Sequence, residues 1–90
     1  MPTVLIVSGS DSSSGAGLSA DLEVVRAMGC RPLLAVTAIT AQTDQKFLSS
    51  QPVASSVFKD QLKAAWDHSD GHLYAVKIGM LPNESLIEVL

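Results

Sequence analysis

The chain has 90 residues, nearly half of them apolar, and a formal net charge of −3. This size allows one hydrophobic core at most. Lys and Arg form no cluster, which disfavours nucleic acid or an anionic membrane as a partner, and no apolar run approaches the roughly 20 residues that span a bilayer. Cys30 is the only cysteine, so an intramolecular disulfide and a multi-cysteine zinc site are excluded.

The N-terminus lacks the basic region and long apolar stretch of a secretory signal, so we expect a cytoplasmic protein. Residues 3–8 are apolar and β-branched without alternation, which is typical of a strand that is covered on both faces. From about residue 16 to 28, apolar side chains recur every three to four positions and predict a helix that ends at Gly29. Residues 31–39 predict a second buried strand.

The second half of the chain repeats this order of elements. We expect a loop over residues 40–52 with a short strand at 47–49, followed by a helix that is capped by Ser55 or Ser56. A third strand over 73–78 then leads to a short helix with Asn83 as its cap.

Strand and helix thus alternate three times, which predicts an α/β fold with a mainly parallel sheet and right-handed crossovers. Three strands leave apolar sheet edges without partners, and doubly wound sheets are usually larger. No internal repeat or domain linker interrupts the pattern. We therefore expect residues 1–90 to form a single incomplete unit.

In open parallel sheets, the loops beyond the carboxyl ends of the strands form the ligand crevice. The first such loop, residues 9–17, combines glycines, hydroxyls and backbone N–H groups near a helix start. It is consistent with a cradle for a small polar ligand or with a solvated linker. It lacks the Lys-Ser/Thr of a Walker A loop, and its G-x-G-x-x-A pattern from Gly15 starts too far beyond the strand for a dinucleotide site.

The other two loops offer single candidates, each with a plain structural alternative. The amide of Gln42 can donate to and accept from a heteroaromatic ring, and Met80 can pack against one. Lys77 ends the third strand, where it is either a phosphate contact or a structural lysine. His68 and His72 have zinc-like spacing, but the turn signal between them argues against a metal site.

Taken together, three ordered motifs closely resemble the hydroxymethylpyrimidine/phosphomethylpyrimidine kinases of the ribokinase-like class. They are residues 9–22 (GSDSSSGAGLSADL), 37–43 (TAITAQT) and 77–81 (KIGML). Residues 57–62 (VFKDQL) are similar to that family's second-helix segment. The resemblance covers nearly the whole chain and implies the N-terminal βαβαβα part of a three-layer α/β/α fold.

What this resemblance implies for function is the ATP-dependent phosphorylation of 4-amino-5-hydroxymethyl-2-methylpyrimidine and then of its monophosphate, in thiamine biosynthesis. ATP and Mg²⁺ are implied as cofactors, at sites outside this chain. No catalytic residue and no metal ligand can be assigned here. The substrate-binding residues implied by matching position are Gly9, Asp11, Ala16, Asp21, Thr40, Gln42 and Met80.

Ser14 and Thr43-Asp44 depart from the family pattern, which has glycine and Asn-Thr at these places. A serine forced to positive φ costs on the order of 1 kcal/mol. Two alternatives come from other classes of function. A non-catalytic pyrimidine-binding or regulatory module stays open, and the composition leaves a homo-oligomer open. A phosphoacceptor receiver domain is disfavoured because the third strand ends without an aspartate.

Overall fold

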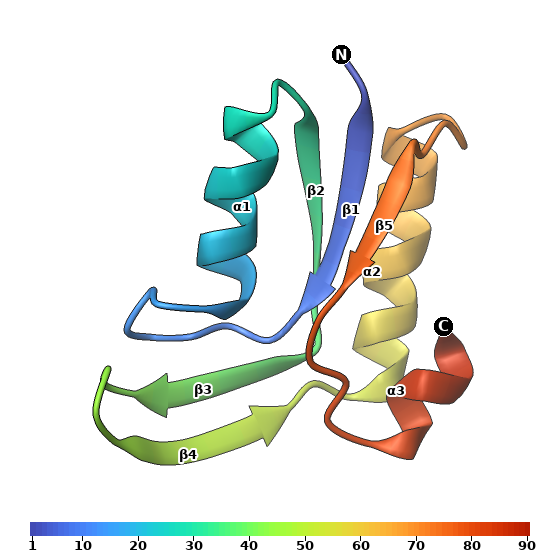
Figure 1. Cartoon of the computed structure of the whole chain (residues 1–90). Coiled ribbons are helices and arrows are strands. Elements are labelled where there is room, and N and C mark those ends of the chain that lie inside the picture. Colours follow the sequence, from blue (N-terminus) through green and yellow to red (C-terminus); the bar gives the residue numbers. More distant parts are fainter.

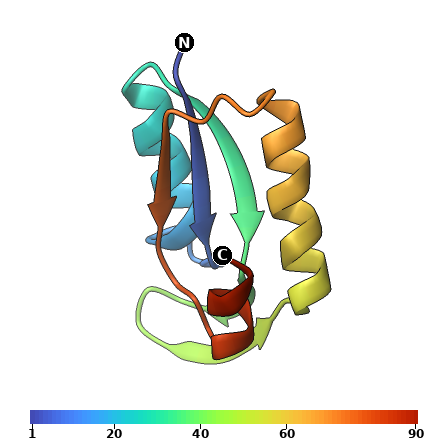
Figure 2. The ribbon, with the colours of Figure 1, turned by 90° about the vertical axis from the view of Figure 1, so that its right-hand side faces the viewer.

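The computed structural model describes all 90 residues and has three layers, with helices on both faces of a parallel sheet (Figures 1 and 2). The sheet contains β1 (Thr3–Ser8), β2 (Arg31–Val36) and β5 (Ala75–Ile78) in the order β2-β1-β5. Both pairings are parallel. The predicted α/β class and the mainly parallel sheet are confirmed. No helix is both long enough and apolar enough to cross a membrane.

The central strand β1 divides the core into two halves because its side chains alternate between the faces of the sheet. Leu5 and Val7 pack in one cluster with residues of α2 (Ser55–His68) and α3 (Glu84–Val89). Val4 and Ile6 pack in the other with Leu18 and Val25 of α1 (Gly17–Ala27). This two-sided burial explains why β1 is continuously apolar in sequence.

The ends of the three helices show which of the predicted start and stop signals are used in the structure. Helix α1 lies within one residue of its prediction, and Gly29 after it has a φ of 76°. Asn83 caps α3 as predicted, since its side chain accepts a hydrogen bond from the Leu86 amide. The predicted cap of α2 at Ser55 or Ser56 is wrong. The cap is Ala54, with extended backbone and no side-chain bond, so packing rather than capping fixes this helix start.

The predicted second strand and the loop after it require correction. Strand β2 ends at Val36, and residues 38–52 form an antiparallel hairpin of β3 (Ala38–Gln42) and β4 (Phe47–Pro52). Thr37 makes the corner between the two sheets: its amide donates to the Ser8 carbonyl, and its buried hydroxyl donates to the Met80 carbonyl. The apolar, β-branched sequence runs through this corner unbroken, so composition alone could not locate it.

The hairpin lies across the carboxyl ends of the three parallel strands, next to the first loop (Figure 1). Strand β5 starts two residues later than predicted and forms one edge of the sheet. Its apolar side chains are only partly covered, and Val76 is 47% exposed. The fold therefore places three loops and a hairpin around one end of the sheet, and it leaves the outer edges of β2 and β5 without a partner strand.

Candidate functional site

A pocket of about 280 Å³ lies at the carboxyl edge of the sheet, where the ligand crevice was expected. It is formed by the first loop, the start of α1, the inner side of β3 and the turn after β5. Six of the seven predicted substrate-binding residues line it, the exception being Asp21. The lining residues are Ser8, Gly9, Ser10, Asp11, Ala16, Gly17, Thr40, Gln42, Lys77, Gly79 and Met80.

Serine hydroxyls hold the first loop against β3. The hydroxyl of Ser12 contacts both backbone groups of Gln42, at 2.7 Å from the nitrogen and 2.8 Å from the oxygen. Two residues earlier, the Thr40 hydroxyl donates to the Ser10 carbonyl, and the Thr40 amide lies 3.3 Å from the Ser10 hydroxyl. These contacts join residues 30 positions apart and make one wall of the pocket from two segments.

The Gln42 side chain lies partly buried in this wall. Its Nε2 donates to the Thr40 hydroxyl at 2.8 Å, and no group of the chain bonds its Oε1. Met80, which follows β5, also lines the pocket. The Met80 sulfur is 3.0 Å from where a Cβ on Gly9 would lie, so glycine at this position leaves room for the thioether.

Gly17 is required where the first loop enters α1. Its φ is 66°, and a Cβ there would lie 2.4 Å from the Gly9 carbonyl oxygen. That oxygen accepts the Leu18 amide at 3.0 Å. Ser14 also has a φ of 66°, so this serine occupies the left-handed region, which favours glycine.

Asp21 lies beside the pocket without lining it. Its Oδ2 forms an ion pair at 2.8 Å with the Lys77 amino group, and Lys77 does line the pocket. The carboxylate side chain is 20% exposed and the lysine side chain 51% exposed. The pair connects α1 to the end of β5, which confirms the structural alternative for Lys77, while a contact of this lysine with a phosphate stays a prediction.

Asp11 lines the pocket from the first loop. Its Oδ1 accepts the Ser13 hydroxyl at 2.6 Å and the Ser13 amide at 2.8 Å. These two bonds favour the charged form and hold the pKa of the Asp11 carboxyl below its ordinary value. The carboxylate is therefore ionised throughout the neutral range, and it shapes the first loop through its own bonds.

The residues present do not fit a metal or a triphosphate. No three His, Cys, Asp or Glu side chains lie close enough together to hold a metal ion. The first loop has the glycines of an anion cradle, but no Lys-Ser/Thr pair follows them.

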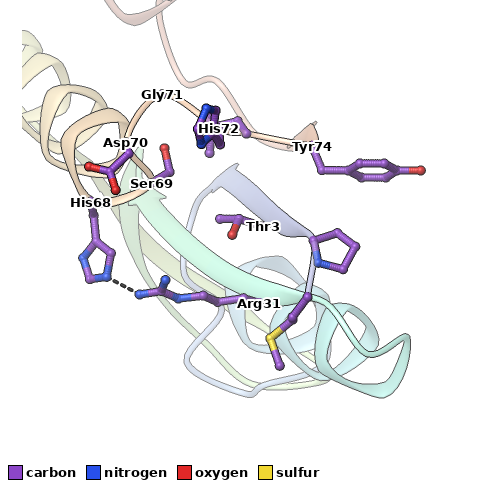
Figure 3. Close-up of a pocket in the computed structure, with 11 residues that line it drawn as sticks. Thr3, Arg31, His68, Ser69, Asp70, Gly71, His72 and Tyr74 are labelled. Atoms are coloured by element: carbon purple, nitrogen blue, oxygen red, sulfur yellow. Dashed lines mark hydrogen bonds between the residues drawn. The ribbon is translucent and has the colours of Figure 1, made fainter.

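A larger, shallower pocket of about 570 Å³ lies at the opposite, amino edge of the sheet (Figure 3). Arg31 contacts His68 there, while His72 and Tyr74 line the rim. It contains none of the residues that the sequence singled out as substrate-binding. Its position at the amino ends of the strands is the wrong one for the crevice of an open parallel sheet.

Sequence reasoning missed the serines that assemble the site. Ser10 and Ser12 were treated only as part of a polar loop, yet both bond to β3. Their partners lie 30 residues away, so no local pattern could identify them. The period-two spacing of Thr40 and Gln42 could have placed these two side chains on one face of a strand, but it does not identify the serines that they contact.

A parallel α/β/α unit with its pocket at the carboxyl edge of the sheet is the architecture of the ribokinase-like kinases, and this is the fold class of the chain. The model of the phosphomethylpyrimidine kinase family matches residues 11–90. The chain belongs to that family.

Three proteins show the extent of the similarity. The chain is 41% identical over 90 residues to the chloroplastic thiamine biosynthetic bifunctional enzyme of Arabidopsis thaliana, covering 100% of this chain and 17% of that enzyme. The crystal structure of phosphomethylpyrimidine kinase from Clostridium difficile superposes with a TM-score of 0.88 at 37% identity, over 99% of this chain and 37% of that one.

The pyridoxal kinase of Staphylococcus aureus in complex with AMP-PCP and pyridoxal gives a TM-score of 0.84 at 33% identity, over 99% of this chain and 34% of that one. The chain thus spans about a third or less of the length of the relatives that it matches.

Proposed function

We propose that residues 1–90 are an incomplete unit of a kinase domain and form the pyrimidine-binding part of a hydroxymethylpyrimidine/phosphomethylpyrimidine kinase. The reaction transfers the terminal phosphoryl group of ATP to the hydroxymethyl oxygen of 4-amino-5-hydroxymethyl-2-methylpyrimidine, and then phosphorylates the monophosphate. The proposed partner of the pocket is this small pyrimidine.

One observation carries the proposal: the three motif segments of the family meet in one pocket, and Gln42 presents an unbonded amide oxygen there. An aminopyrimidine edge carries an N–H donor next to a ring-nitrogen acceptor. A glutamine amide offers the complementary acceptor and donor. Met80 and the small residues Gly9 and Ala16 leave room for a planar ring against the wall.

The proposed roles of the charged residues follow from their positions. Lys77 is the only cationic side chain at the pocket, and the Asp21 carboxylate holds it in place. A positive charge here favours a substrate that carries a phosphate. We propose that ATP and Mg²⁺ bind on parts of the kinase outside these residues, because phosphoryl transfer depends on positioning that this pocket does not supply.

A chimera tests the proposal. Residues 1–90 replace the matching segment of the Clostridium difficile kinase, whose fold they share. Replacing Gln42 by Ala leaves the ring's polar atoms unpaired, a loss of about 1 to 3 kcal/mol. This corresponds to a fall of roughly 5- to 150-fold in kcat/KM for the pyrimidine. The KM for ATP should stay unchanged. In the control Gln51→Ala, which alters an exposed residue of β4, both the kcat/KM for the pyrimidine and the KM for ATP should stay unchanged.

The outcomes separate the alternatives. An unchanged pyrimidine kcat/KM in Gln42→Ala, or an equal loss for pyrimidine and ATP, would contradict the proposed role of this amide. A folded chimera that binds the pyrimidine without phosphorylating it would favour a non-catalytic binding or regulatory module.

A further inference from the structure

The orientation of the Gln42 amide follows from a chain of two hydrogen bonds. The Ser10 backbone carbonyl can only accept, and the Thr40 hydroxyl donates its single proton to it. The Thr40 oxygen is then left as an acceptor for the next group. Gln42 Nε2 lies 2.8 Å from it and donates. The amide nitrogen therefore faces Thr40, and the amide oxygen faces the pocket.

The reverse orientation is disfavoured by the same bonds. If Oε1 faced Thr40, the hydroxyl proton would have to turn toward Gln42. The Ser10 carbonyl would then lose the Thr40 donor, in a part-buried region. Thr40 is only 6% exposed, so water has little access to replace this bond. The Ser12 hydroxyl bonds both backbone groups of Gln42 at the same time, which holds the backbone from which this side chain extends.

We propose that Thr40 is a specificity-determining residue that acts through Gln42; this inference rests on the proposed function. The fixed amide offers its oxygen to a ring amino group and its second N–H to the adjacent ring nitrogen. A 4-amino pyrimidine presents this order of donor and acceptor. The 4-oxo counterpart presents the reverse order, an oxygen acceptor beside a ring N–H. Its oxygen would face the Gln42 amide oxygen and its ring N–H would face the Gln42 N–H, so neither hydrogen bond forms.

Three variants of the 90-residue chain isolate this role. Thr40→Val keeps the shape of the side chain and removes the hydroxyl, so the amide is free to turn and pair with either ring. Thr40→Ser keeps the hydroxyl and should restore the fixed orientation. Ser12→Ala loosens the Gln42 backbone while leaving the Thr40 contact in place. It should weaken both ligands alike.

The test is isothermal titration calorimetry of each variant with 5-hydroxymethyl-2-methylpyrimidine carrying either a 4-amino or a 4-oxo group. The unmodified chain and Thr40→Ser should prefer the amino ligand. In Thr40→Val the ratio of the two affinities should fall by about five- to tenfold, the effect of one hydrogen bond. A merely structural role would lower both affinities and leave their ratio unchanged.

Side-chain amide NMR gives a second readout that needs no ligand. The Gln42 amide proton that is bonded to Thr40 should exchange slowly with water in the unmodified chain and in Thr40→Ser, whereas the second, pocket-facing proton exchanges faster. In Thr40→Val the first proton should lose this protection. Two results would overturn this inference while leaving the proposed function intact. One is an unchanged ratio of the amino-ligand and oxo-ligand affinities in Thr40→Val, and the other is equal binding of the two ligands by the unmodified chain. Failure of the unmodified chain to bind either ligand would overturn the proposed function together with it.

Discussion

Two glycines with similar positive φ values allow the cost of backbone strain to be separated from the cost of a steric clash. Gly17 and Gly29 have φ values of 66° and 76°. A methyl group on Gly29 would meet no atom within 4 Å, whereas one on Gly17 would lie 2.4 Å from the Gly9 carbonyl oxygen. Alanine at either position requires the left-handed conformation, at about 1 to 2 kcal/mol. Only at Gly17 does a backbone clash add roughly 1 to 3 kcal/mol more.

Hydrogen exchange of single amides measures the difference. The Leu18 amide donates to Gly9, so Gly17→Ala should accelerate its exchange by more than about 30-fold, the equivalent of 2 kcal/mol. Gly29→Ala should leave Leu18 unchanged and accelerate only the Cys30 amide, which donates to α1. Equal acceleration of the Leu18 amide in both variants would show that conformational strain alone explains the need for glycine at position 17.

Three further predictions concern the helix contact, the first loop and the sheet edge. The Gln61 side chain bonds both backbone groups of Val36: its Oε1 accepts the Val36 amide at 2.7 Å, and its Nε2 donates to the Val36 carbonyl at 2.9 Å. Gln61→Leu should weaken this contact by about 1 to 3 kcal/mol, and unchanged exchange of the Val36 amide would contradict this. Ser13→Ala should raise the pKa of Asp11 toward its ordinary value, because both Ser13 contacts favour the charged carboxylate and one is lost. A carboxyl whose pKa is lowered by folding adds stability above roughly pH 4, and this stability is lost as the pH falls through the pKa of the folded state. The loss of stability in acid should therefore be smaller in Ser13→Ala. An Asp11 titration by NMR that is identical in both proteins would refute the role of Ser13. The unpaired edge of β5 should make the chain self-associate, and Val76→Lys should reduce this in sedimentation velocity, whereas a monomeric unmodified chain would refute the role of the edge.

The elements of the fold could be predicted where local signals are strong. The β1 strand is apolar on both faces, α1 has a regular period and ends before Gly29, and Asn83 caps α3. The corner at Thr37 could not be predicted. It depends on bonds from Thr37 to Ser8 and Met80, which lie 29 and 43 positions away, and the residues on both sides of it have the same strand propensity.

The candidate site likewise has a part that could be predicted from the sequence and a part that could not. The resemblance supplied the pocket residues, and six of them meet around one cavity. The contacts that hold them were not predictable, because a serine such as Ser12 has the same local sequence whether it faces solvent or bonds Gln42. The ion pair between Asp21 and Lys77 likewise joins residues 56 positions apart. Long-range pairing of this kind depends on topology.

Direct observation of where a pyrimidine binds tests the central claim most simply. The ¹⁵N-labelled chain is titrated with 4-amino-5-hydroxymethyl-2-methylpyrimidine, and amide shifts are followed by NMR. The account predicts shifts that saturate at Gln42, Gly79 and Met80, around the pocket at the carboxyl edge. Shifts confined to the pocket around Arg31 and Tyr74 at the amino edge, or no shifts at millimolar ligand, would contradict it.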